Sequence, residues 1–201
     1  MDPYVYPETK VLRNLRDIRD PERLEKFEMD MTTSRVRELL SSPKPGRFDS
    51  AHLQAIHHYI FQDVYDWAGE FRTVDISKGN DLFGLNQHIV SNLNRTFSGL
   101  KAERFLQGSD AKRFCGRGAY YLGEINAIHP FRDGNGRTQR EFMRQLALRN
   151  GYTLDWSKVS RDQMIEASKE SFRRGNSGLE RVLSSALIEL RSRGFDRDDD
   201  R

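Results

Sequence analysis

Apolar residues recur three or four positions apart along most of this 201-residue chain. The clearest run contains Leu53, Ile56, Ile60, Val64 and Trp67, which would share one face of an α-helix. A strand would instead place alternate residues on one side, and most of the chain has no such alternation. The spacing therefore predicts an all-α fold, with the exception of one short segment.

Capping residues and helix breakers set the expected boundaries of these helices. Asp20 followed by Pro21 suits an N-cap and the first helical position, and Ser160 suits a second N-cap. Gly69 and Gly151 are suitable stops. The predicted helices cover residues 21–41, 50–67, 86–99, 110–127, 136–149, 161–173 and 178–192.

Residues 70–85 are the exception to the helical spacing. Phe71–Ile76 contains β-branched residues in partial alternation, Lys78–Asp81 has the composition of a turn, and Leu82 and Phe83 follow it. We therefore predict one small β-hairpin here, which is the only strand signal that we find in the chain.

The chain is predicted to form a single domain over residues 1–195. It contains no internal repeat and no low-complexity linker. Residues 1–19 are expected to wrap the body as an irregular segment, and residues 196–201 to form a charged tail. A chain of this length can fold without disulfides or metals, and its single cysteine, Cys115, excludes a disulfide framework and a cysteine-rich zinc site.

Composition and charge exclude several further classes of protein. The chain has 33 Lys and Arg against 30 Asp and Glu, and a net charge of +3 excludes a strongly basic nucleic-acid coat. The first ten residues lack the pattern of a secretory signal, and no apolar run approaches the roughly 20 residues of a membrane helix. We therefore expect a soluble protein made in a reducing, cytoplasmic compartment, with no membrane partner.

One segment, His129–Arg140, combines residues typical of phosphate chemistry. Gly134 and Gly136 flank Asn135 directly before a predicted helix. Glycines let backbone N–H groups approach a ligand, and the helix start adds unpaired N–H groups and the positive end of the helix dipole. The segment therefore predicts an anion site suited to phosphate.

The charged residues of this segment extend the prediction to an oligophosphate. Arg137 and Arg140 are three residues apart, so their guanidinium groups would share a helix face and could grip further phosphates. A di- or triphosphate usually brings Mg²⁺, for which Asp133 is the only acid of the loop. Histidine titrates at about 6.5, so His129 suits a general base at neutral pH, and the implied reaction is attack of a hydroxyl on a phosphate.

Each of these residues alone has a simpler interpretation. A histidine before proline is usually a packing or turn residue, Gly-Asn-Gly is usually a turn, and paired arginines usually form a solvated helix face. Phe131 is expected in the core, where it could set the aim of His129. His52, His57 and His58 have no carboxylate partner at metal spacing, so we expect packing or surface groups. The order of base, acid, glycines and arginines at one junction favours the functional interpretation.

The segment His129–Arg140 matches the Fic-domain signature, H-x-F-x-[D/E]-G-N-G-R-x-x-R, at every specified position. The chain also resembles bacterial Fic toxins of the VbhT type from Bartonella in runs that begin at Asp2, His57 and Arg140, and the resemblance covers residues 2–190. It implies a single Fic-type helical domain with a β-hairpin flap near the active site. It further implies an adenylyltransferase, which moves AMP from ATP to a Ser, Thr or Tyr hydroxyl of a target protein.

The resemblance also assigns roles within the signature. His129 would deprotonate the target hydroxyl, and Asp133 would hold Mg²⁺ against the α- and β-phosphates of ATP. Arg137 would contact the β-phosphate and Arg140 the γ-phosphate. The anion hole for the α- and β-phosphates would be formed by Gly134, Asn135 and Gly136.

Two other segments receive implied roles. The flap residues Lys78, Gly79, Asn80 and Asp81 would lie close to the nucleotide, and Lys78 and Gly79 would dock the target by strand addition. Asn176, in a Gly-Asn-Ser turn, is a candidate for the adenine pocket.

Gly136 bears on the type of reaction. A Fic relative that phosphorylates its target has lysine at the corresponding position and binds the nucleotide reversed, so glycine favours AMP transfer. A Fic-type protein kinase, another nucleotidyl transfer and a non-catalytic ATP-binding regulatory module are the alternatives, although intact His129 and Asp133 argue against the last. Nucleic-acid binding and a Walker-type NTPase are disfavoured, because no helix-turn-helix, zinc or Walker pattern occurs.

The chain has no convincing copy of the inhibitory motif of Fic enzymes, [S/T]-x-x-x-E-[G/N], whose glutamate pairs with the second signature arginine. Ser34–Glu38 and Ser185–Glu189 have the spacing, but leucine follows each. The resemblance therefore implies that a separate small antitoxin supplies the glutamate and contacts Arg140. The chain alone would be a toxin or effector, acting in the bacterial cytoplasm or, after translocation, in a host or recipient cell.

Overall fold

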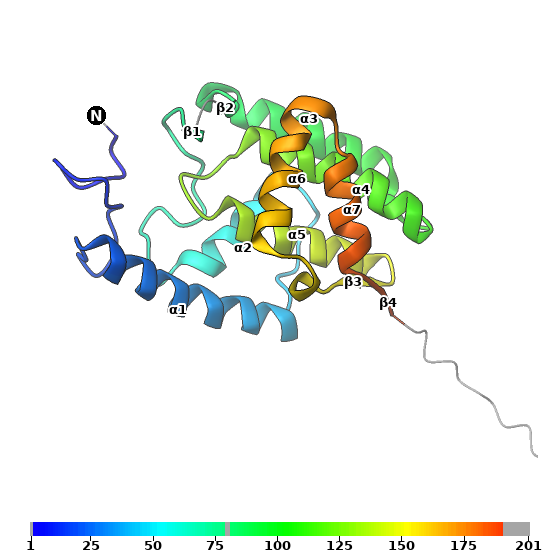
Figure 1. Ribbon diagram of the computed structural model, residues 1–201, viewed down its shortest axis with the longest axis horizontal. Coiled ribbons are helices and arrows are strands. Elements are labelled where there is room, and N and C mark those ends of the chain that lie inside the picture. The colour runs from blue at the N-terminus through cyan, green and yellow to red at the C-terminus, as the bar shows by residue number, and fades with distance from the viewer. Residues whose placement is uncertain (1, 79–80, 191–201) are drawn as a thin grey trace, which may run out of the picture.

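The computed structural model describes residues 2–78 and 81–190, which form seven α-helices gathered around α4 and α5 (Figure 1). This arrangement confirms the predicted all-α class. No helix within the described ranges is long and apolar enough to cross a membrane. The helices are α1 (Pro21–Ser41), α2 (Ser50–Phe61), α3 (Ile89–Ala102), α4 (Ala111–Ile128), α5 (Asn135–Arg149), α6 (Arg161–Arg174) and α7 (Ser177–Ala186), and three short 3₁₀ turns cover Asn86–His88, Arg104–Leu106 and Trp156–Lys158.

The predicted capping residues begin their helices as expected. The side chain of Asp20 accepts a hydrogen bond from the backbone N–H of Arg23, and Pro21 occupies the first turn of α1. Ser160 and Gln163 form a reciprocal capping box at the start of α6. These side chains satisfy N–H groups that a helix leaves without an internal partner.

Helix α5 lies in the centre of the fold. Ten of its 15 residues are buried, including a buried ion pair in which Arg144 and Glu141 approach to 2.8 Å. Helices α2 and α4 pack against it, and α6 and α7 cross in front of α4 and α5 in Figure 1. Because α5 is fixed on several sides, its N-terminus is a rigid platform for the site described below.

The prediction that a helix runs from residue 50 to residue 67 is wrong at its end. Helix α2 ends at Phe61, and turns follow. Val64 and Trp67 are still buried, so the apolar spacing identified core residues but not their backbone conformation. The returning segment is held by α2 itself, since the Nδ1 atom of His58 lies 2.9 Å from the carbonyl oxygen of Ala68.

Strand pairing differs from the prediction in two ways. A hairpin is present within residues 70–85, but it is limited to β1 (Ser77–Lys78) and β2 (Asp81–Leu82), and Phe71–Ile76 is not a strand. A second antiparallel pair, β3 (Tyr152–Leu154) with β4 (Leu187–Glu189), replaces the expected last turns of α7. The two partners are far apart in sequence, so a pattern within either segment does not reveal the pairing.

The N-terminal segment before α1 packs on the body, and several of its residues belong to the hydrophobic core. The Tyr4 ring meets the Trp67 ring edge-on, with centroids 5.5 Å apart. Arg132 forms an ion pair with Asp2 at 2.8 Å. This ion pair joins the N-terminal segment to the loop that follows α4.

Candidate active site

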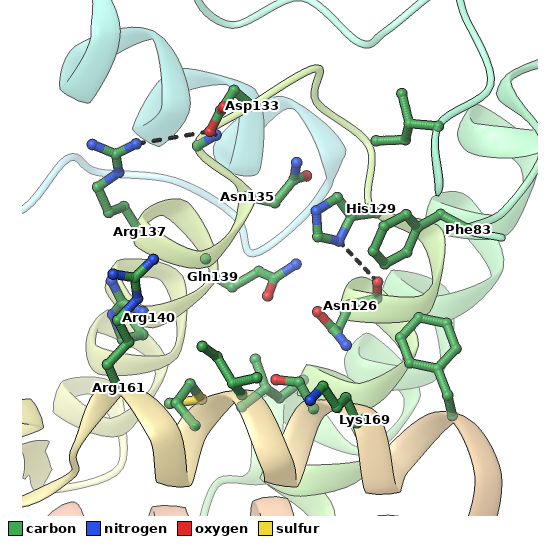
Figure 2. Close-up of a pocket in the computed structure, with 18 of the residues that line it drawn as sticks. Phe83, Asn126, His129, Asp133, Asn135, Arg137, Gln139, Arg140, Arg161 and Lys169 are labelled. Carbon is green, nitrogen blue, oxygen red and sulfur yellow. Dashed lines mark hydrogen bonds and ion pairs between the residues drawn. The ribbon is translucent and has the colours of Figure 1, made fainter. Parts of the chain in front are cut away.

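A pocket of about 910 Å³ opens between the loop after α4, the start of α5, helix α6 and the flap, by which we mean residues 70–85 (Figure 2). It contains most of the residues singled out in the sequence. From the signature it is lined by His129, Arg132, Asp133, Gly134, Asn135, Gly136, Arg137, Gln139 and Arg140. The other walls include Ile76, Ser77 and Phe83 of the flap, Leu122 and Asn126 of α4, and Trp156, Arg161, Met164, Lys169 and Phe172.

The N-terminus of α5 faces this pocket without a capping side chain. Gly134 is the N-cap residue, with φ of 79°, and no side-chain hydrogen bond caps the helix. A Cβ atom at Gly134 would lie 2.3 Å from the Phe61 ring, so only glycine fits both the space and the left-handed backbone. The first N–H groups of α5 therefore have no capping side chain as acceptor.

Asn135 supports the loop rather than presenting its side chain to the pocket. Its Oδ1 atom accepts from the N–H of Phe131 at 2.9 Å, and its Nδ2 atom donates to the carbonyl oxygen of Phe131 at 2.8 Å. The side chain is buried. Any contribution of Asn135 to an anion hole therefore comes from its backbone N–H.

His57 supports the same loop from α2. Its Nε2 atom lies 3.0 Å from the carbonyl oxygen of Asp133, and its Nδ1 atom accepts from the N–H of Gly69 at 2.8 Å. Its ring stacks on Phe131 with centroids 3.9 Å apart. Burial lowers the pKa of His57 to about 3, so the ring is neutral, with its proton on Nε2.

The packing role expected for His57 is therefore correct, but its position beneath the signature loop was not foreseen. Sequence spacing within α2 cannot reveal a hydrogen bond to a residue 76 positions away. The same is true of Asn126, which lines the pocket and whose Nδ2 atom is buried without a partner in the described part of the chain. An unpartnered buried donor facing a cavity is a candidate ligand contact.

His129 ends α4 in the left-handed conformation, with φ of 49°. Its Nδ1 atom lies 3.2 Å from the carbonyl oxygen of Asn126, and its ring stacks on Phe83 with centroids 3.8 Å apart (Figure 2). A hydrogen bond to a carbonyl places the proton on Nδ1. In the neutral ring, Nε2 is then the nitrogen able to accept a proton.

The two signature arginines have different surroundings. Arg137 donates to Glu28 at 2.6 Å and to Thr32 at 3.1 Å, both on α1, and lies over the Phe61 ring. Arg140 faces no carboxylate among the described residues, and burial, together with the charge of Arg137, lowers its pKa. A charged guanidinium without an anion partner in a pocket is suited to a phosphate.

Asp133 lies at the rim of the pocket with its side chain 48% exposed. Its Oδ1 atom accepts a hydrogen bond from the N–H of Gly134 and lies 3.8 Å from the Nη2 atom of Arg137. Within the described residues no group of three or more His, Cys, Asp or Glu side chains could hold a metal by itself. One accessible carboxylate beside the uncapped start of α5 nevertheless suits Mg²⁺, which takes few protein ligands and keeps several waters.

Not every candidate from the sequence is brought to the pocket. Asn176 does not line it, and the side chain packs on α4, where a Cβ atom at Gly123 would meet it at 2.4 Å. Lys78 of β1 and Asp81 of β2 are opposite each other in the backbone register of the flap hairpin. Gly79 and Asn80 lie outside the described residues.

Comparison with known proteins identifies the chain. The model of the Fic/DOC family matches residues 47–147. The chain belongs to the Fic/DOC family. It is 47% identical to protein adenylyltransferase VbhT of Bartonella schoenbuchensis over 93% of this chain but only 38% of that protein, and 35% identical to the probable protein adenylyltransferase Fic of Escherichia coli over 94% and 93% of the two chains.

Solved structures share the whole architecture. The Fic domain of a Bartonella quintana effector with bound ADP superimposes with a TM-score of 0.89 at 27% identity, covering 94% of this chain and 95% of that one. BepC of Bartonella tribocorum with bound AMPPNP gives a TM-score of 0.89 at 25% identity, covering 94% and 97%. This Fic/DOC chain thus shares its fold with relatives that were solved with bound nucleotide.

Proposed function

We propose that this chain transfers AMP from ATP to a Ser, Thr or Tyr hydroxyl of a target protein. The observation that carries the proposal is one pocket that holds both the uncapped N-terminus of α5 and the imidazole of His129. The relatives solved with ADP and AMPPNP support a nucleotide as the ligand. Asn135 and Gly136 would bind the α- and β-phosphates through their backbone N–H groups, and the N–H of Gly134 would join them on release from Oδ1 of Asp133.

The other signature residues would serve as the general base, as ligands of the phosphates and as the ligand of Mg²⁺. The Nε2 atom of His129 takes the proton of the target hydroxyl, whose oxygen then bonds to the α-phosphorus while the bond to the β-phosphate oxygen breaks and pyrophosphate leaves. Arg140 would bind the γ-phosphate, and Arg137, already held by Glu28, the β-phosphate. Asp133 would hold Mg²⁺, which neutralises phosphate charge when bound.

The flap would hold the target next to this site. Its residues Ile76 and Ser77 line the pocket, so an extended target segment added to β1 would lie beside His129. Lys78 would dock the target, and Lys78 and Asp81 would lie close to the nucleotide; the same roles expected of Gly79 and Asn80 fall outside the described residues. Asn176 remains a candidate for adenine recognition only if the ligand reaches the α6–α7 turn.

Labelled ATP tests the type of transfer. With [α-³²P]ATP we expect label on target protein, and with [γ-³²P]ATP none. The surroundings of Gly136 are compatible with this result, because among the described residues a Cβ atom there would meet only Nη1 of Arg140, at 3.5 Å, which leaves space for the phosphates. Label from the γ position alone would instead establish a Fic-type kinase, and no label from either would favour a non-catalytic module.

We further propose that inhibition comes from a separate antitoxin whose glutamate binds Arg140. The two glutamates with the right spacing are engaged elsewhere: Glu38 accepts from Tyr59 at 2.7 Å and from Arg35 at 3.0 Å, and Glu189 lies in β4 opposite Tyr152. Glu38→Gly and Glu189→Gly are therefore expected to leave the initial rate of AMP transfer within about twofold of wild type. A large increase in either variant would reveal self-inhibition.

We also propose the extent of the domain and the compartment in which it acts. Residues 1–195 would form one Fic domain, followed by a charged tail at 196–201. The chain would act in the bacterial cytoplasm or in a recipient cell, and several structural relatives are described as VirB-translocated effectors. Expression with and without the native neighbouring genes, with growth as the readout, tests toxicity and restraint together.

A further inference from the structure

The C-terminal end of α4, which carries His129, is capped by the roots of the flap. The last carbonyls of a helix have no partner within it. Here the N–H of Gly84 donates to Ala127 at 2.9 Å, and the guanidinium of Arg72 donates to Ile128 at 3.1 Å and to His129 at 2.8 Å. These donors come from the two ends of the flap, one before β1 and one after β2.

Arg72 also holds the two ends of the flap together. Its Nη1 atom donates to the carbonyl oxygen of Val74 at 2.6 Å, and Nη2 donates to that of Gly84. Its backbone N–H donates to the carbonyl oxygen of Pro130 at 2.9 Å. The side chain is wholly buried, although arginine is rarely found without solvent contact. One guanidinium therefore bonds to carbonyls of both flap ends and of the helix that bears the base.

We call this set of bonds from the Arg72 guanidinium the clamp. It affects the geometry of His129 in two ways. The two bonds to Ile128 and His129 lie on either side of a residue with φ of 49°, a conformation that a non-glycine side chain rarely adopts. Gly84 follows Phe83, whose ring stacks on the imidazole. A shift of the flap end would therefore move both the backbone and the ring that orient the base.

We propose that Arg72 is a positioning residue that fixes the flap and His129 to each other. The proposal rests on the proposed AMP transfer only for its catalytic consequence. A target segment held by the flap would then be placed at a set distance from Nε2 of His129, since one side chain anchors both. Within the described part of the chain the Arg72 guanidinium does not bond to Arg140 or to the N-terminus of α5, so we expect its substitution to leave the nucleotide site in place.

Arg72→Lys tests the clamp, because an ammonium keeps the positive charge at the helix end but cannot reach four carbonyls. We expect kcat to fall by about 10- to 100-fold while the Kd of ATP changes less than about threefold. Arg144→Lys is the matched control: Arg144 is also buried and binds Glu141 and the carbonyl oxygen of Leu39, but it does not line the pocket. It should lower stability and leave kcat within about threefold of wild type.

Proton NMR of the His129 ring gives a readout that does not need activity. Stacking on Phe83 should shift the ring C–H resonances upfield in wild type and in Arg144→Lys, and Arg72→Lys should move them towards the values of an exposed histidine. If wild type transfers no AMP, the proposed function fails while this spectral test still stands. Unchanged resonances in Arg72→Lys, or changed resonances with an unchanged kcat in an active enzyme, would overturn the proposal.

A milder variant covers the case in which Arg72→Lys does not fold. Asp75 is half-exposed; its Oδ1 atom accepts from the N–H of Asn86 at 2.7 Å and lies 3.8 Å from Nη1 of Arg72, so Asp75→Asn weakens the charge interaction with the guanidinium without opening the core. We expect a two- to fivefold fall in kcat and a smaller shift of the same His129 resonances in the same direction. Wild-type values for both quantities would contradict the clamp.

Discussion

The two walls of the pocket, the signature loop at residues 129–140 and the flap at residues 70–85, are built in different ways. The loop is braced from within by Asn135 and from beneath by His57, and it continues into the buried helix α5. The flap has only two short strands and is joined to the body through Arg72 and Gly84. The contrast suggests a division in which the loop fixes the nucleotide and the flap sets where the target lies relative to the base. The following experiments test that division in order of expected effect.

The largest effect is expected from His129→Ala. Removal of the base should reduce AMP transfer by about 10³-fold, because a positioned general base contributes that order of rate. ATP affinity should stay within about threefold, since the phosphate ligands are untouched. Initial rates with [α-³²P]ATP and isothermal titration with ATP measure the two quantities. A parallel loss of both would mean that His129 also contributes to ATP binding, which contradicts a role as base alone.

Gly134→Ala should have the next largest effect, because it changes the most constrained residue of the signature loop. The added Cβ would lie 2.3 Å from the Phe61 ring, and the alanine backbone would have to adopt a φ of 79°. We expect a loss of about 2–4 kcal/mol in the free energy of unfolding and at least a 10-fold loss of ATP affinity. Gly136→Ala is the control, since its Cβ would have room within the helix and should leave the free energy of unfolding unchanged or raise it by up to about 1 kcal/mol. Equal effects in urea unfolding would contradict a rigid loop.

Arg140→Gln should weaken ATP binding by about 10- to 100-fold, the range of one or two charge-assisted hydrogen bonds. AMP binding should change less than threefold, because AMP has no γ-phosphate. Lys169→Gln, on the opposite wall and paired with Glu166 at 2.7 Å, should change ATP affinity less than threefold. Comparable losses in the two variants would show that both walls bind the nucleotide.

The smallest expected effect concerns pH and His57. Its pKa is lowered from 6.5 to about 3 in the folded chain, so below pH 6.5 the unfolded chain binds a proton that the folded chain does not. The contribution of His57 to the free energy of unfolding is therefore fully present above pH 6.5. It falls by up to about 1.4 kcal/mol per pH unit as the pH drops from 6.5 towards 3. The difference in unfolding free energy between pH 7.5 and pH 5.5 should be smaller in His57→Gln than in wild type. Equal pH dependence in the two proteins would mean that His57 is not the buried neutral group.

The sequence predicted the fold class and the loop because both are encoded locally. Apolar spacing and the caps at Asp20 and Ser160 depend on neighbours a few residues away, and the glycines and arginines of the signature occur within one loop and one helix. The early end of α2 and the β3–β4 pair were not predicted, because they depend on contacts between distant segments. The same holds for His57, Arg72 and the Glu28–Arg137 pair, in which each partner is ordinary in its own sequence context.

A crystal structure with Mg²⁺ and a non-hydrolysable ATP analogue tests the central claim most directly. We expect the α- and β-phosphates on the N-terminus of α5, the γ-phosphate on Arg140, and the α-phosphorus facing Nε2 of His129. A nucleotide bound in reverse, with its terminal phosphate at His129, or one seated outside this pocket, would contradict the account.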